Sequence, residues 1–361
     1  MLFAALTTTA VVFAAEPCYV DAQRLTHLGK LCKTTNPYHR VEVEAYPELT
    51  AREAALLKYT AGEAILFETN SSQVWVRAKY GIRYPLYAMP LTATCGYNLY
   101  IENEKGEWQW AASRVPGYGI TKEGKDNLER PLQMVRNLPE GTKRCLLYLP
   151  IFAELKQLEI GVDEGATIAA VENPFRHKIA VFGSSYTQGH GATNAGQTYP
   201  AFLQRQTGFD IINFGMSGNS KLQPVMAEIL ASTDADAFLL DAFSNPNSDL
   251  IRNRIHPFIQ TIRAKHPKTP LIFMRTLYCE VRAFDTVRDQ WEVDRNKVVD
   301  SLMSKIVKQY DDVYFIDMEY YAGEDHMTSA DGTHPMSWGY KRWADAIEKP
   351  LVKILKKHGI K

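Results

Sequence analysis

A serine framed by glycines directly follows a short apolar run in the second half of the sequence. Ser185 lies within residues 183–189, which read Gly-Ser-Ser-Tyr-Thr-Gln-Gly, and the apolar run covers residues 178–182. Glycine permits the tight turn that exposes a serine hydroxyl at such a position. A serine hydroxyl is a weak nucleophile until a base removes its proton, so the pattern predicts Ser185 as a nucleophile only where a base lies nearby. The neighbouring Ser184 is the alternative nucleophile.

The candidate base is His334, which stands three residues after Asp331 near the end of the chain. A neutral imidazole accepts a proton near pH 7. A carboxylate bound to the other ring nitrogen would fix the tautomer and stabilise the imidazolium that forms. We therefore predict that Ser185, His334 and Asp331 form a catalytic triad. The alternative for Asp331 is a helix N-cap with no part in catalysis.

Two further loops offer hydrogen-bond donors for the negative oxygen that forms during acyl transfer. Gly215 follows the predicted strand 210–214, and Asn245 comes shortly after the predicted strand 237–241. Glycine lets a backbone N–H approach a ligand closely, and the Asn245 amide can donate from the same rim. We predict an oxyanion hole made of Ser185, Gly215 and Asn245, in which one donor lowers the barrier by about 3–4 kcal/mol. The alternative for Asn245, which precedes a proline, is a turn-stabilising role.

Five apolar runs that alternate with helical patterns must position these residues. The runs cover residues 178–182, 210–214, 237–241, 270–274 and 313–316. Such alternation predicts a parallel, doubly wound sheet, whose ligands bind at the carboxyl ends of the strands.

The chain before residue 175 instead shows short β-like runs punctuated by turns, without intervening helices. This pattern predicts an all-β sandwich or jelly roll. We therefore expect a β-sandwich domain over residues 16–172 and an α/β hydrolase domain over residues 176–361.

The first residues resemble an export signal. Residues 2–14 form a largely apolar, uncharged run that ends in small residues, with the length of a signal-peptide core and too short to span a bilayer. We predict a signal peptide over residues 1–15 and export to the periplasm or the medium, with a buried N-terminal strand or helix as the alternative. Residues 15–17, before Cys18, do not resemble a lipoprotein cleavage site, so we expect no membrane anchor.

The composition argues against several other classes of function. The 361 residues include 41 basic and 41 acidic side chains, so the formal net charge is zero. Nucleic acids and anionic membranes both favour proteins with a basic excess, and we expect neither as a partner. The sequence holds no C-x-x-C and no tight Cys/His cluster, so we expect no metal and no cofactor.

Taken together, the four loops resemble the conserved blocks of the SGNH (GDSL-like) hydrolase family. The matching positions are Gly183-Ser184-Ser185 with Gly189, then Gly215, then Asn245, and finally Asp331 with His334. Ser184 stands where the family usually carries aspartate. Upstream, residues 96–100 read Gly-Tyr-Asn-Leu-Tyr, similar to the Gly-x-Asp-Leu-Tyr hallmark of a β-rich domain that precedes one branch of the family.

The resemblance implies a flavodoxin-like α/β/α sandwich preceded by a jelly-roll-like β domain. It also implies a serine esterase acting on short-chain O-acyl esters, with an O-acetyl group on a carbohydrate as the expected substrate. This substrate rests on analogy between folds. Two alternatives stay open: an esterase or lipase for other acyl esters, and a catalytically inactive carbohydrate-binding protein.

Overall fold

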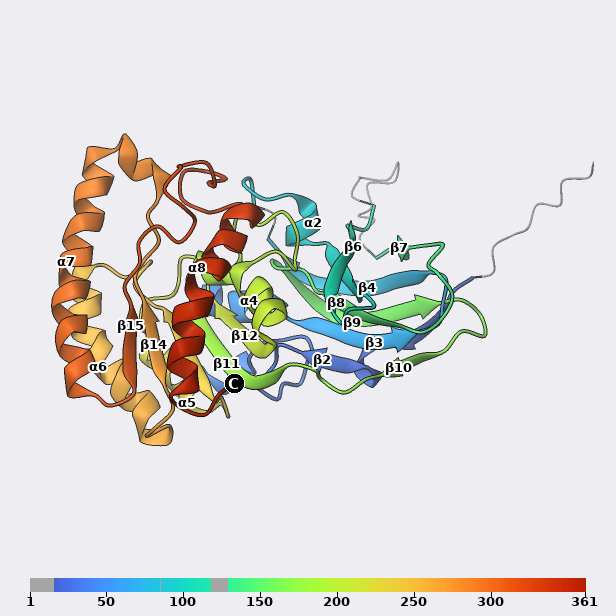
Figure 1. Cartoon of the computed structure of the whole chain (residues 1–361), viewed down its shortest axis with the longest axis horizontal. Helices are drawn as coiled ribbons and strands as arrows, with labels where there is room; N and C mark the ends of the chain where they lie inside the picture. The colour runs from blue at the N-terminus through green and yellow to red at the C-terminus, as the bar shows by residue number, and fades with distance from the viewer. Residues whose placement is uncertain (1–15, 85, 118–128) are drawn as a thin grey trace, which may run out of the picture.

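The computed structural model describes residues 16–84, 86–117 and 129–361 (Figure 1). The predicted signal peptide over residues 1–15 lies outside the described residues. Two sheets of antiparallel strands come first, and one sheet of parallel strands with helices follows. This confirms the predicted fold class, a β-sandwich domain followed by an SGNH-type α/β/α domain. Within the described ranges, no helix is both long and apolar enough to cross a membrane.

Within residues 16–84, 86–117 and 129–172, the β domain has ten strands and a few short helices. The strands are β1 (Cys18–Asp21), β2 (Thr26–Leu28), β3 (Ala64–Thr69), β4 (Val74–Arg83), β5 (Tyr97–Glu102), β6 (Trp108–Arg114), β7 (Leu132–Val135), β8 (Lys143–Tyr148), β9 (Ala153–Val162) and β10 (Ile168–Ala170). The helices are η1 (Ala22–Arg24), η2 (Val43–Ala45), α1 (Ala51–Leu57) and α2 (Leu91–Thr94).

These strands form two sheets that enclose an apolar core. One sheet has the order β1-β9-β4-β7, and the other has the order β10-β3-β8-β5-β6 with β2 paired to β3. Phe67 and Leu147 from the second sheet meet Val76 and Ile160 from the first in one buried cluster. Strands that alternate inward and outward side chains can bury one face in this way, which is why the alternating pattern was readable from the sequence.

The hydrolase domain alternates strands with helices. Its strands are β11 (Arg176–Gly183), β12 (Phe209–Gly215), β13 (Ala237–Asp241), β14 (Leu271–Met274) and β15 (Val313–Ile316). Its helices are α3 (Ser185–Gln188), α4 (Tyr199–Thr207), α5 (Pro224–Ala231), α6 (Ser248–Lys265), η3 (Glu280–Ala283), α7 (Thr286–Gln309) and α8 (Ser337–Lys356).

In the parallel sheet, β11 lies between the edge strand β12 and the central strand β13. The strand order is β12-β11-β13-β14-β15, so the chain moves to one side of β11 and then to the other. Helices α4 and α8 lie in front of the sheet in Figure 1 and pack against each other. The order reverses at the carboxyl end of β11, and in open α/β sheets such a switch point is where ligands bind. The Gly183–Ser185 segment begins at this point.

A buried arginine joins the two domains. Arg40, only 2% exposed, reaches from the β domain to the carboxyl end of β12. Its guanidinium donates hydrogen bonds to four backbone carbonyls: those of Leu56 (2.6 Å) and Tyr59 (2.8 Å) in the β domain, and of Asn213 (2.8 Å) and Gly215 (3.0 Å) in the hydrolase domain. One apolar core also continues from the β domain into the hydrolase domain. The β domain therefore helps to hold β12 where it enters the site.

We predict that Arg40→Met lowers the free energy of unfolding by about 3–5 kcal/mol, because four buried carbonyls lose their charged donor. Urea unfolding at pH 7 measures the change. The control is Arg77→Met, which removes an exposed ion pair with Glu159 and should cost no more than about 1 kcal/mol. Equal losses in the two variants would contradict the role assigned to Arg40.

Candidate active site

Ser185 lies on a sharp turn between β11 and α3. Strand β11 ends at Gly183, Ser184 caps the helix by accepting the N–H of Tyr186 at 3.2 Å, and Ser185 is its first residue. A side chain on Gly183 would place its Cβ 2.0 Å from the Thr187 hydroxyl, so the turn requires glycine at this point. The structure places Ser185 at the carboxyl edge of the sheet, where the sequence predicted it.

A buried carboxylate anchors this turn. Asp241, at the end of β13, is fully buried and pairs in register with Gly183. Its Oδ2 accepts the N–H (3.1 Å) and the hydroxyl (2.7 Å) of Ser184, and the hydroxyl of Thr187 at 3.1 Å. Burial raises the pKa of the Asp241 carboxyl, and these hydrogen bonds oppose the rise. Because the Ser184 hydroxyl is committed to Asp241, the geometry favours Ser185 over Ser184 as the nucleophile.

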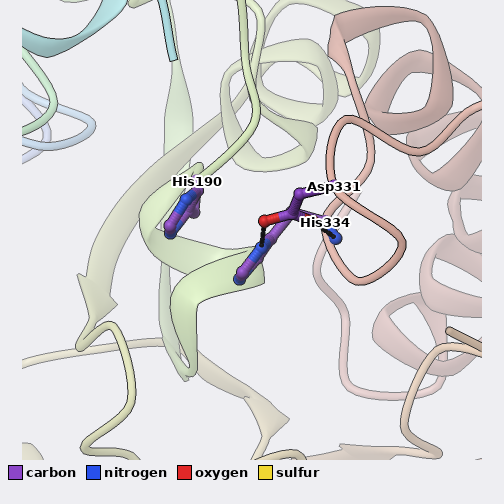
Figure 2. A group of neighbouring side chains, drawn as sticks. All are labelled: His190, Asp331 and His334. Carbon is purple, nitrogen blue, oxygen red and sulfur yellow. Dashed lines mark hydrogen bonds and ion pairs between the residues drawn. The ribbon is translucent and has the colours of Figure 1, made fainter. Parts of the chain in front are cut away.

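Hydrogen bonds link Ser185, His334 and Asp331 in series. His334 Nε2 lies 2.9 Å from Ser185 Oγ, and His334 Nδ1 lies 2.8 Å from Asp331 Oδ2. Ser185 precedes Asp331 by 146 residues, whereas Asp331 and His334 are only three residues apart. Figure 2 shows the Asp331 and His334 side chains joined beside the ring of His190. The structure thus brings together the three residues that the sequence predicted as a triad.

The loop that carries His334 is held by its own backbone. Ser329 and Pro335 form an isolated bridge, and the N–H of Ala330 donates to the carbonyl of His334 at 2.7 Å. A side chain on Gly191, which has a φ of 89°, would approach the carbonyl of Pro335 to 2.4 Å. Glycine at position 191 therefore lets the segment after the nucleophile pack directly on the loop of the base.

Hydrogen bonds favour the ionised form of the Asp331 carboxyl. Burial alone would raise the pKa of its carboxyl, but hydrogen bonds from the His334 ring and from the N–H groups of His334 and Thr333 hold that pKa well below its usual range. Asp331 therefore accepts from the ring and from the turn at the same time, so its N-cap-like geometry and its contact with the base are compatible.

The three predicted oxyanion donors differ in whether their N–H groups are free to bind an oxyanion. Asn245 Oδ1 accepts the N–H of Ser220 at 3.1 Å, which leaves the amide nitrogen as the outward donor. The N–H of Ser185 has no hydrogen-bond partner within the described residues. The N–H of Gly215, in contrast, already donates to Asn213 Oδ1 at 2.7 Å. This bond disfavours the predicted donor role of Gly215.

A steric reason explains the glycine at position 215 instead. A Cβ there would lie 2.2 Å from the backbone nitrogen of Gln188, so glycine allows α3 to pack against β12. In the same loop, Gly218 is exposed, has a φ of 72°, and has an N–H with no partner among the residues described here. Because its N–H is not engaged, Gly218 is the alternative candidate donor of this loop, and the sequence pattern Ser-Gly-Asn at residues 217–219 was the available signal.

His190, Asp331 and His334 are close enough for one atom of each to approach a common metal ion. Their orientations do not suit a metal. The two imidazole rings stack with a 7° angle between their planes, and lone pairs lie in the ring planes, so parallel rings do not direct them at one ion. Both nitrogens of His334 also face Ser185 and Asp331. The expectation of no metal stays a prediction that this geometry favours.

A serine, a histidine and a carboxylate linked at the switch point of a doubly wound sheet define the arrangement of a hydrolase with a serine nucleophile. The model of the GDSL-like lipase/acylhydrolase family matches residues 176–352, and the model of the N-terminus of SGNH-hydrolase-type esterases (GxDLY) matches residues 18–168. A GDSL-like lipase from Bacteroides ovatus is 37% identical, with a TM-score of 0.88, and the match covers 94% of this chain and 98% of the lipase. The chain belongs to the GDSL-like (SGNH) acylhydrolase family, and it is a hydrolase of the esterase type.

More distant structures share the fold. The salicylyl-acyltransferase SsfX3 from a tetracycline biosynthetic pathway is 20% identical, covering 94% of this chain and 97% of its own, with a TM-score of 0.74. A carbohydrate esterase family 2 enzyme with a carbohydrate binding domain, from Corynascus thermopiles (Myceliophthora fergusii), is 14% identical, covering 82% and 94%, with a TM-score of 0.58. No curated protein matches the chain.

We predict opposite effects for substitutions at the two adjacent serines. Ser185→Ala should lower turnover of an aryl acetate by about 10³-fold or more, with the melting temperature unchanged, because the hydroxyl is the attacking group. Ser184→Ala should keep most of the activity but lower stability by about 1–3 kcal/mol, because buried Asp241 loses a donor. Steady-state kinetics and thermal unfolding of both variants measure these effects. Wild-type turnover in Ser185→Ala, with loss in Ser184→Ala, would reverse the assignment.

Proposed function

We propose that the protein hydrolyses short-chain O-acyl esters, with Ser185 as nucleophile, His334 as general base and Asp331 as the group that orients the base. The observation that carries this proposal is the continuous hydrogen-bond series from Ser185 Oγ through the His334 ring to Asp331. A binding protein has no need of such a series, so it argues against the inactive alternative.

In the proposed reaction, Ser185 Oγ attacks the ester carbonyl carbon while its proton passes to His334 Nε2. Asp331 stabilises the imidazolium through Nδ1, where its carboxylate is already in place. The carbonyl oxygen becomes negative and is met by the N–H of Ser185, the side-chain amide of Asn245 and an N–H of the 215–218 loop, for which Gly218 is the alternative candidate to Gly215.

The tetrahedral intermediate then collapses as His334 gives its proton to the departing alcohol, which leaves an acyl group on Ser185. Water attacks this acyl group and passes a proton to His334. Collapse of the second intermediate releases the carboxylic acid and returns the proton to Ser185. Neither half of the cycle requires a cofactor or metal.

We further propose that the alcohol is a carbohydrate carrying O-acetyl groups. Polar or small residues make up the loops after β12 and β13, residues 217–220 and 244–248, and these two loops offer little apolar area for a fatty chain. The carbohydrate esterases of similar fold lend support by analogy. Export, proposed from residues 1–15, would bring the enzyme to extracellular glycans.

We predict that aryl acetate is hydrolysed faster than butyrate and that decanoate is barely hydrolysed, because each extra methylene finds little apolar surface to cover. Acetylated xylan, mannan or pectin fragments should have higher kcat/KM than any aryl ester, because contacts to the sugar stabilise the transition state.

The measurement is a chain-length series at fixed enzyme concentration, followed by acetate release from the glycans. A maximum at medium or long acyl chains, or no acetate released from any glycan, would replace the carbohydrate substrate by another acyl ester.

A further inference from the structure

His190 occupies a rigid position five residues after Ser185. Its side chain is buried, with 7% of the residue exposed. The backbone is fixed on both sides, since the N–H of His190 donates to the carbonyl of Ser185 at 2.9 Å and the hydroxyl of Tyr340 donates to the carbonyl of His190. Any movement of the His190 ring must therefore come from side-chain rotation alone.

Packing prevents that rotation. The His190 ring lies face to face on the His334 ring (Figure 2). The ring centroids are 3.8 Å apart, and the angle between the ring planes is 7°. Phe152 of the β domain presents its ring at 74° to His190, with centroids 6.0 Å apart. The His334 ring thus packs on the His190 ring, and the His190 ring packs on Phe152.

Stability does not explain an imidazole at this position. Both ring nitrogens of His190 are buried and have no hydrogen-bond partner among the described residues. A buried polar atom without a partner costs free energy that a hydrocarbon side chain of similar size would not. The imidazole therefore acts through its contact with the His334 ring.

The His334 ring becomes positive only when it takes the proton of Ser185. A neutral aromatic face held against a cation attracts it, so the stack stabilises the charged ring more than the neutral one. The stack also keeps water from that face of His334 and restricts the ring to the plane in which Nε2 meets Ser185 Oγ.

The effect requires His190 to remain uncharged. Burial, aided by the charge of a positive His334 and opposed by the Asp331 carboxylate, lowers the pKa of His190 to about 4. These two groups are the titratable side chains that act on it from the facing loop, while Phe152 is apolar and the Tyr340 hydroxyl binds the backbone. Above about pH 5 the His190 ring is therefore uncharged.

We propose that His190 is a positioning residue, whose flat neutral ring holds the plane of the base and stabilises the charge that His334 takes up. This inference rests on the proposed roles of Ser185 and His334. The ring face carries the effect, so another flat ring should replace it, and a side chain of similar volume without a flat face should not.

The test compares His190→Phe with His190→Leu in the full-length protein, using aryl acetate at pH 7.5. We expect His190→Phe to keep kcat within about threefold of wild type, and His190→Leu to lower kcat by about tenfold with KM nearly unchanged. Thermal unfolding of both variants serves as the folding control. If His190→Leu unfolds, His190→Met supplies an unbranched, non-planar side chain for the same comparison.

Equal kcat in wild type and in a folded Leu or Met variant would overturn the inference, as would a Phe variant as slow as the Leu variant. An increase in KM at constant kcat would also overturn it, because it would place His190 at the substrate. Failure of the proposed function is distinguishable, since wild-type protein would then hydrolyse no ester.

Discussion

The arrangement of the site depends on the hydrogen bonds that the buried carboxylate of Asp241 accepts. An ionised carboxylate without water is tolerated only where donors surround it. Asp241 obtains them from Ser184 and Thr187 on the nucleophile turn and, at 2.7 Å, from the Ser244 hydroxyl in the loop that carries Asn245. One side chain at the end of a central strand therefore sets two loops relative to each other, with the nucleophile in one and an expected oxyanion donor in the other.

Close backbone contacts at two glycines hold the neighbouring segments of the site in place. Gly215 lets α3 lie against β12, and Gly191 lets the nucleophile segment lie against the loop of His334. Arg40 then binds the carbonyls at the end of β12 from the β domain, and Phe152 of the same domain packs on His190. The β domain is therefore part of the support of the site and is packed against it through buried contacts.

Sequence reasoning predicted those features that depend on local pattern. Buried parallel strands appear as apolar runs, so the five strands and the loops at their ends were readable, and Asp331 stands only three residues from His334. The role of Asp241 was not predicted, because a strand-ending aspartate gives no sign of which hydroxyls surround it. The stack of His190 on His334 joins residues 144 positions apart, and the engagement of the Gly215 N–H by Asn213 depends on side-chain orientation; both are visible only in the fold.

The central claim is that Ser185 is a nucleophile activated by His334. It is tested most directly by treating the protein with a fluorophosphonate, in which a serine oxygen displaces fluoride from phosphorus, and then mapping the adduct by peptide mass spectrometry. We expect one adduct, on Ser185, that is absent in Ser185→Ala and forms much more slowly in His334→Ala. An adduct on Ser184, or ester hydrolysis by a protein that forms no adduct, would contradict the claim.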